Sequence, residues 1–429
     1  MNSPPVRSAC DAPGPRWRDW VLAFLGALVL SDALDVPVYW LVGWPSSRPG
    51  LPIARLPLLV VFAAAPLLLI GHWRSAAEQA RAAWILWPPV ALAFLSATWS
   101  EWPETTLLWA TALLGTSVFG LALAVRFPAA AQSSLTAGVA ATIAAASVLA
   151  TSLWPWLILS TGSWRGIYIH KNLLGRVMAL GVAAAFVSAL SPRHRARSLA
   201  ALAVCGAILL ATKSRASVLV ALLTVAVPIL LLVARHWKQH AGAILAGGAA
   251  VSVLAVLFLI ATPTGLALVK RGRTLSDRTI IWRNVLGGVL KAPWLGHGYA
   301  AFWPSAAGQN TLARIRSRTP IGHAHNGMLD LLAEVGVAGV LLVLVPLGFY
   351  AGAALRHAIE PRAPACLWPV TFLVFFVASN AAESALLRHK LYWALYVAAV
   401  CHVASTRRQR RAAVSADVEG AREEMRPSR

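Results

Sequence analysis

Apolar segments without charged residues recur along this chain, and many of them are about 20 residues long, the length that a helix needs to cross a bilayer. Only 13% of the 429 residues are charged, and 58% are hydrophobic. A soluble globular protein carries roughly twice that charged fraction. The sequence therefore excludes a soluble fold and predicts an all-α, polytopic membrane protein.

Hydropathy predicts about twelve transmembrane helices. They cover residues 18–40, 52–71, 83–99, 105–126, 134–156, 172–190, 197–212, 215–234, 241–261, 334–355, 366–383 and 390–404. Together they form a single integral membrane domain over residues 1–404. The basic stretch 405–429 has no apolar periodicity, so we expect it to be a disordered cytoplasmic tail.

The distribution of Lys and Arg predicts the orientation of the chain in the membrane. The formal net charge is +22, and every second loop between the predicted helices is basic. Basic loops face the cytoplasm, so both termini are expected there, and the long loop 262–334 is expected outside, which is the periplasm if the source is a Gram-negative bacterium. No soluble basic domain exists to bind nucleic acid.

The loop 262–334 joins the ninth and tenth predicted helices and is itself basic, against the positive-inside trend. It carries seven arginines, namely Arg271, Arg273, Arg278, Arg283, Arg314, Arg316 and Arg318. A loop of this length usually carries function. Its charge indicates an anionic partner.

Two helices are predicted within this loop. Ser276 is expected to cap a helix from Asp277 to Leu290, which Pro293 and Gly296 end. A second helix is expected to begin near Asn326 and to continue into the tenth membrane helix.

His325 is the main candidate for chemistry, because it stands next to Asn326 at the start of a helix. The positive end of the helix dipole disfavours the imidazolium, and a neutral histidine can accept a proton from a hydroxyl. The alternative is a histidine that only caps a helix at the interface. His323 and His325 could also suggest a metal, but Asp330 and Glu334 lie further along the helix, so no metal site is predicted.

Basic residues at other outer helix ends suggest a phosphate-binding surface. Arg215 opens the eighth predicted helix, and Arg165, Lys171 and Asn172 precede the sixth. A guanidinium at the membrane surface can fork onto phosphate oxygens, and Arg278 in the loop could add positive charge. The alternative for Arg215 is snorkelling to lipid headgroups.

Several short motifs, taken in order, resemble the bacterial O-antigen ligase and polysaccharide polymerase superfamily. The resemblance covers roughly residues 150–400 and rests on Arg215-x3-Leu219, His325-Asn326-x9-Gly336-x-x-Gly339, Ser276-Asp277-Arg278, Pro293 to Gly298 and Ala382-Glu383-Ser384. The stretch Trp164 to Gly175 is similar to the exopolysaccharide polymerase branch in particular.

This resemblance implies a GT-C-like inner-membrane glycosyltransferase whose donor is a glycan on undecaprenyl diphosphate. It implies inversion at the anomeric carbon without a metal or other cofactor. By motif, Arg215 and Arg278 would hold the diphosphate, and His325 would deprotonate or orient the acceptor hydroxyl. The remaining substrate-binding candidates are Arg165, Lys171, Asn172, Asn326 and Arg388.

Three functions stay open at this point. A polymerase would move the growing chain from one lipid diphosphate onto the repeat unit carried by another, and the Trp164–Gly175 stretch favours this function. A ligase would join a finished glycan to the lipid A core. A transporter or flippase predicts charged residues near mid-membrane and broken helices. Other polysaccharide-assembly proteins would be further partners.

Overall fold

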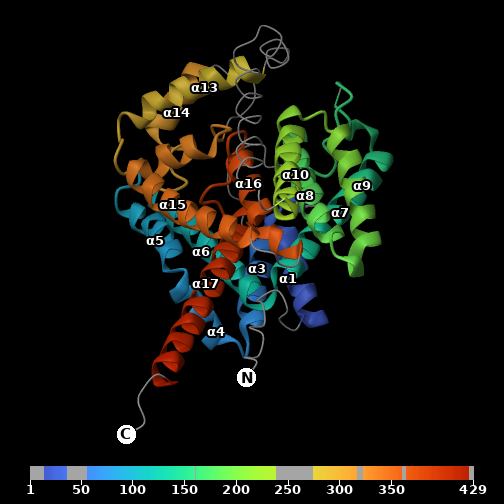
Figure 1. Cartoon of the computed structure of the whole chain (residues 1–429). Coiled ribbons are helices and arrows are strands. Elements are labelled where there is room, and N and C mark those ends of the chain that lie inside the picture. Colours follow the sequence, from blue (N-terminus) through green and yellow to red (C-terminus); the bar gives the residue numbers. More distant parts are fainter. Residues whose placement is uncertain are drawn as a thin grey trace.

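A computed structural model describes residues 14–35, 56–159, 161–237, 274–315, 322–359 and 364–424 of the chain. Within these ranges the regular secondary structure is helical, apart from one isolated β-bridge between Ile158 and Trp164 (Figure 1). The predicted all-α class is therefore confirmed for the described residues.

The helices are numbered as in Figure 1. They are α1 (Trp17–Leu30), α3 (Leu56–Leu69), α4 (Trp73–Ala82), α5 (Trp87–Leu95), α6 (Pro103–Arg126), α7 (Ala129–Leu153), α8 (Lys171–Ala189), α9 (Arg195–Ala211), α10 (Arg215–His236), α13 (Thr274–Val289), α14 (Ala306–Ile315), α15 (Gly327–Ile359), α16 (Trp368–Asn380) and α17 (Leu391–Glu424).

Six of the described helices are long and apolar enough to cross a membrane, namely α6 to α10 and α15. The count becomes seven if α3 and α4, which meet at 105°, form one bent span. The sequence predicted about twelve spans. Five predicted spans account for the difference. The helices α5 and α16 are shorter apolar helices, α1 ends at Leu30, α17 with the predicted span 390–404 is not among the candidates, and the predicted span 241–261 lies outside the described residues.

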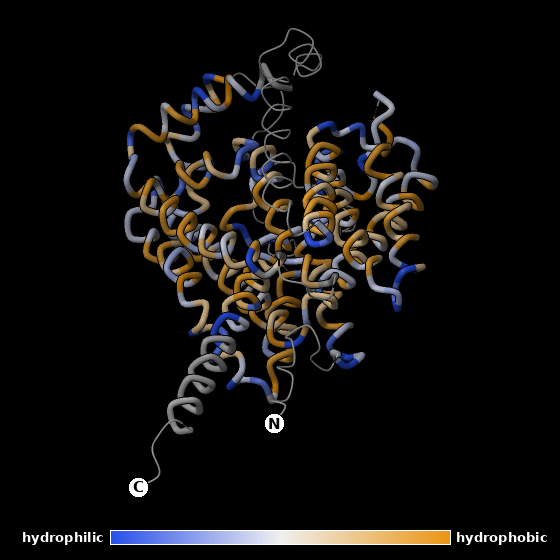
Figure 2. The backbone as a smooth tube through the Cα atoms, in the orientation of Figure 1, coloured by the Kyte–Doolittle hydropathy of each residue, from blue (hydrophilic) through white to orange (hydrophobic). Residues whose placement is uncertain are grey.

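The first half of α17 lies in the core of the bundle and packs against α6. The indole N–H of Trp393 on α17 donates a hydrogen bond of 2.9 Å to the hydroxyl of Ser117 on α6. Figure 2 shows apolar residues concentrated in the helical bundle, with polar residues mainly at its two ends. The prediction of a disordered tail after residue 404 differs from the structure, because α17 continues as a helix to Glu424.

At the opposite end of the molecule from α4 and the end of α17, α13 and α14 pack on each other and form a small second core (Figure 1). Val285 on α13 and Phe302 are fully buried there. The predicted helix in the loop is confirmed, but it begins at Thr274, so Ser276 lies inside it and is not its cap. The helix α14 was not predicted.

Backbone hydrogen bonds between residues 293–298 and 333–338 join the start of α15 to the loop. The N–H groups of Val337 and Ala338 donate to the carbonyls of Pro293 and Trp294, at 2.9 and 3.1 Å. This contact needs Gly336, whose φ of 64° and ψ of −167° interrupt the helix and are accessible almost only to glycine. A Cβ there would lie 2.3 Å from the backbone of Trp294.

We expect Gly336→Ala to destabilise the folded protein by roughly 3 kcal/mol or more, because backbone strain and a clash with backbone atoms act together. Gly348→Ala on the same helix is the matched control, since nothing lies within 4 Å of a Cβ there. Thermal unfolding of the detergent-purified protein, with the yield of monodisperse material, measures the effect. Equal melting temperatures for the two variants would contradict it.

Candidate functional site

Glu383 stands where several segments far apart in the sequence meet. It follows α16 in a turn that Asn380 fixes, because the Asn380 side-chain oxygen accepts from the N–H groups of Ala385 and Leu386, at 2.8 and 2.9 Å. The backbone N–H of Glu383 donates to the Ser379 carbonyl at 2.9 Å. The Glu383 side chain is 9% exposed, so a buried carboxylate is held in a defined position.

His325 is presented to this carboxylate by a strained backbone. Its φ is 53°, which is uncommon for a residue with a side chain and is a feature of functional sites. The carboxylate of Asp330 holds the preceding turn by accepting from the N–H of Ala324 at 3.0 Å, and Ser384 donates its hydroxyl to the same carboxylate. Asn326 caps α15 as predicted, accepting from the N–H groups of the second and third helical residues.

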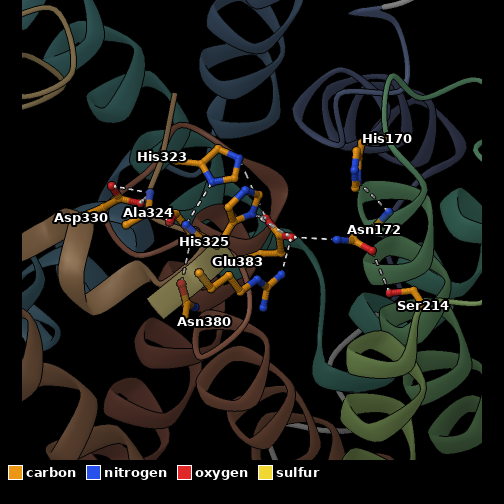
Figure 3. A network of polar contacts seen from close by, with 12 residues as sticks. His170, Asn172, Ser214, His323, Ala324, His325, Asp330, Asn380 and Glu383 are labelled. Carbon is orange, nitrogen blue, oxygen red and sulfur yellow. Dashed lines mark hydrogen bonds and ion pairs between the residues drawn. The ribbon is translucent and has the colours of Figure 1, made fainter. Parts of the chain in front are cut away.

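Four side chains surround the Glu383 carboxylate (Figure 3). His325 Nδ1 lies 3.2 Å from it and Asn172 Nδ2 lies 3.4 Å from it. Arg278 Nη2 lies at 3.5 Å and His323 Nε2 at 4.0 Å. The carboxylate thus joins the loop helix α13, the start of α15 and the start of α8, and we call these five residues the Glu383 cluster.

The start of α10 lies beside this cluster. The Ser214 hydroxyl donates to the Asn172 side-chain oxygen at 3.2 Å (Figure 3). Arg215 is the next residue and the first of α10. His170 caps α8 by accepting from the N–H of Asn172 at 3.3 Å. The first turns of α8, α10 and α15 therefore point toward one region, and partial positive charge at helix N-termini favours anions.

The other predicted residues lie outside the Glu383 cluster. Lys171 Nζ donates to the Ser163 hydroxyl at 3.4 Å, and Arg165 is half-buried. Arg388 forms an ion pair of 2.7 Å with Glu334, whose side chain is 3% exposed. Because Glu334 occupies Arg388, this arginine is placed to hold α15 against the segment before α17.

Sequence reasoning missed Glu383 and Arg176 as site residues. Arg176 lies on α8, is 6% exposed, and places its guanidinium 4.4 Å from the ring centroid of Tyr392. Its Nε and Nη1 have no hydrogen-bond partner within the part of the chain that the structure describes. Both residues fall within predicted spans, where an ionisable side chain is itself a signal of function.

Burial and neighbouring charges set the protonation of the cluster. Burial raises the pKa of Glu383, but the hydrogen bond and charge of His325, together with Arg176 and His323, outweigh it and bring this pKa to about 2. Burial and the charge of His325 lower the pKa of His323 to about 4. Burial also lowers the pKa of His170. The cluster therefore contains an ionised carboxylate beside His323, which resists protonation, and His170 next to the cluster resists protonation as well.

His323, His325 and Glu383 could also hold a metal ion, since one ligand atom from each lies within 4.8 Å of the others. Two imidazoles and a carboxylate are ordinary ligands for zinc and iron. However, Arg278 lies 3.5 Å from the same carboxylate, and a nearby fixed cation opposes a second positive charge. The arrangement fits an organic ion-pair network better than a metal centre.

The lowered pKa of His323 predicts a loss of stability in mild acid. An unfolded chain takes up a proton at this histidine near pH 6.5, whereas the folded chain does so only near pH 4. The stability due to neutral His323 is therefore present above pH 6.5 and is lost as the pH falls from 6.5 to 4. We expect His323→Gln to reduce the decline in melting temperature between pH 7 and 4.5; an unchanged decline would contradict this assignment. His170, with the same direction of shift, leaves a residual slope.

Part of the chain is similar to a known protein family. Residues 200–344 match the O-antigen ligase family. The matched region contains Arg215, Arg278 and His325, and it ends before Glu383. The resemblance to O-antigen ligases and polymerases that the motifs indicated is thereby confirmed.

A curated relative points in the same direction. The exopolysaccharide production protein ExoQ of Rhizobium meliloti (strain 1021) is 26% identical over 221 residues, which are 48% of this chain and 50% of that protein. The match thus spans about half the length of the relative. Together with the O-antigen ligase match, it supports a function of the ligase or polymerase type in the membrane.

Proposed function

We propose that this protein is a membrane glycosyltransferase that moves a glycan from an undecaprenyl-diphosphate donor to a glycan acceptor. The observation that carries the proposal is the contact of His325 Nδ1 with the Glu383 carboxylate at 3.2 Å, beside Arg278 at 3.5 Å from the same carboxylate. A histidine and a cation thus contact one carboxylate, and both residues lie within the region that matches the O-antigen ligase family.

In this proposal His325 is the general base. With its Nδ1–H donated to Glu383, the Nε2 atom carries a lone pair that accepts the proton of the acceptor hydroxyl. The hydroxyl oxygen then bonds to the anomeric carbon as the bond from that carbon to the diphosphate oxygen breaks, which inverts the configuration. Glu383 stabilises the imidazolium that forms and fixes the ring, as the acid does in a catalytic triad.

The leaving group is a diphosphate, so negative charge grows on it as the glycosidic bond breaks. Arg278 and Arg215 are proposed to stabilise this charge, and fixed cations do so best where water is partly excluded. The Arg278 side chain is 18% exposed, which leaves it reachable by a substrate but largely shielded from bulk water. The lipid tail of the donor keeps the reaction at the membrane surface, which we place on the periplasmic side.

The exopolysaccharide relative favours a polymerase, and the name of the matching family favours an O-antigen ligase as the second candidate. The glycans of a deletion strain separate them. A polymerase mutant carries single repeats attached to lipid A or to the carrier, without long chains. A ligase mutant accumulates long chains on the lipid carrier. A glycan profile of the deletion strain that is identical to that of the parent strain overturns both the polymerase and the ligase function.

The reaction is proposed to need no metal, so a chelator should not inhibit it. We expect the transfer rate of the purified protein after EDTA treatment to stay within about twofold of the untreated rate, because arginines and not a bound ion supply the positive charge for the leaving group. The measurement is glycan extension from a lipid-diphosphate donor before and after exhaustive chelation. Loss of activity that added Zn²⁺ or Mn²⁺ restores would show that the two histidines and Glu383 hold a metal.

A further inference from the structure

A second feature lies at the opposite end of α8 from the Glu383 cluster. The 19 residues of α8 begin at Lys171 beside the cluster and end at Ala189, which separates the two ends by roughly 28 Å. The turn that follows carries Arg193 and leads into α9. The alternation of basic loops predicts that this turn lies on the cytoplasmic side, away from the proposed reaction.

A cavity of about 570 Å³ opens at this end between α1, α7 and the start of α9. A second cavity of about 330 Å³ runs along α1 and α7 and shares Trp20, Ser134 and Gly138 with the first. The two cavities therefore adjoin each other, and together we call them the interhelical groove. Along α1 the groove is lined by Val21, Phe24 and Leu25, so this part of it is apolar.

The mouth of this groove is basic. Arg193, His194 and Arg197 line it, and no Asp or Glu of the described ranges does. Arg197 contacts the His194 ring nitrogen at 3.4 Å, and no carboxylate of the described residues lies within ion-pair distance of either arginine. The guanidinium groups of Arg193 and Arg197 are thus exposed, have no ion-pair partner among the described residues, and lie beside the apolar part of the groove.

We propose that this interhelical groove binds an anionic phospholipid of the cytoplasmic leaflet. Its phosphate would lie between Arg193 and Arg197, and one acyl chain would follow α1 and α7 past Gly138. Basic pockets between transmembrane helices on the cytoplasmic side are suited to such headgroups. The charge complementarity selects an anionic over a zwitterionic lipid, and the apolar part along α1 selects a lipid over a soluble phosphate.

A larger side chain at Gly138 is expected to block the groove without disturbing the helix packing. Nothing lies within 4 Å of a Cβ built at this glycine, so a larger side chain enters open space and not its own neighbours. Replacing a helical glycine also favours the helix. Gly206 on α9 is the matched control, because a Cβ there also meets nothing within 4 Å, and Gly206 lines neither cavity.

The experiment is native mass spectrometry of the full, delipidated chain titrated with phosphatidylglycerol, or with phosphatidylcholine of the same acyl chains. We expect phosphatidylglycerol to bind more tightly, Gly138→Leu to abolish that preference, and Gly206→Leu to retain it. Each of Arg193→Gln and Arg197→Gln should weaken phosphatidylglycerol binding roughly fivefold.

Three results overturn the proposal. Equal binding of the two lipids would show that the mouth does not select charge. Undiminished phosphatidylglycerol binding to Gly138→Leu would show that the groove is not the site. Complete displacement of the lipid by millimolar inorganic phosphate would show a phosphate site without a place for the acyl chain. None of these readouts depends on glycan transfer, so failure here leaves the proposed function untouched.

Discussion

His325→Ala is expected to lower glycan transfer by roughly 100- to 10,000-fold, the usual contribution of a positioned general base. The loss should come without a change in folding, because the His325 side chain is 28% exposed and its ring contacts the polar cluster and not the apolar core. Transfer by purified protein, normalised to the amount of monodisperse protein, measures it.

Two further variants make this prediction specific to the base. His323→Ala, two residues away, removes an imidazole whose nearest contact with Glu383 is 4.0 Å, and we expect it to cost roughly tenfold at most. Glu383→Gln keeps the size of the side chain but removes the charge that stabilises the imidazolium, so it should cost roughly 100-fold or more. If His325→Ala worked as well as His323→Ala, His325 would not be the base.

Arg278→Ala is expected to lower the rate constant of transfer by roughly 100- to 1,000-fold, because a fixed cation near the leaving diphosphate acts mainly in the transition state. Arg283→Ala is the matched control, since Arg283 is exposed on the same helix, α13. Kinetics with a lipid-diphosphate donor should place the loss in kcat more than in KM.

Arg278→Lys tests whether shape matters as well as charge. Lysine keeps the positive charge but cannot make the forked contact of a guanidinium with phosphate oxygens, so partial recovery is expected. A loss for Arg278→Ala no greater than that for Arg283→Ala would remove Arg278 from the site. A loss in donor affinity alone would make it a binding residue without a role in bond breaking.

The helical class and the loop helix followed from the sequence because they rest on local patterns. The apolar period and the turn residues Pro293 and Gly296 are enough to place a helix ending at Val289. The count of twelve spans stays unconfirmed, because segments such as α16 are apolar but short and the predicted span 241–261 lies outside the described residues. The helix α14 was missed because it is only ten residues long and its buried face is made of small residues, Ala307, Gly308 and Thr311.

The candidate site was predictable in part, because some of its residues belong to local sequence patterns. His325, Arg278 and Asn172 stand near helix starts with recognisable motifs, and the structure brings all three to one carboxylate. That carboxylate, Glu383, is 58 residues from His325 and 211 from Asn172 in sequence. No local pattern reports contacts across such separations, so the partner that organises the cluster had to be read from the fold.

The clustering of Asn172, Arg278 and His325 around Glu383 also has a consequence for biogenesis. Helices enter the membrane in order from the N-terminus, and Glu383 is the last of these residues to leave the ribosome. Until α16 has inserted, the imidazole and the guanidinium lack the acid that aligns them. Under the proposed function, the base and the cation are therefore not aligned until the C-terminal portion of the chain is in place.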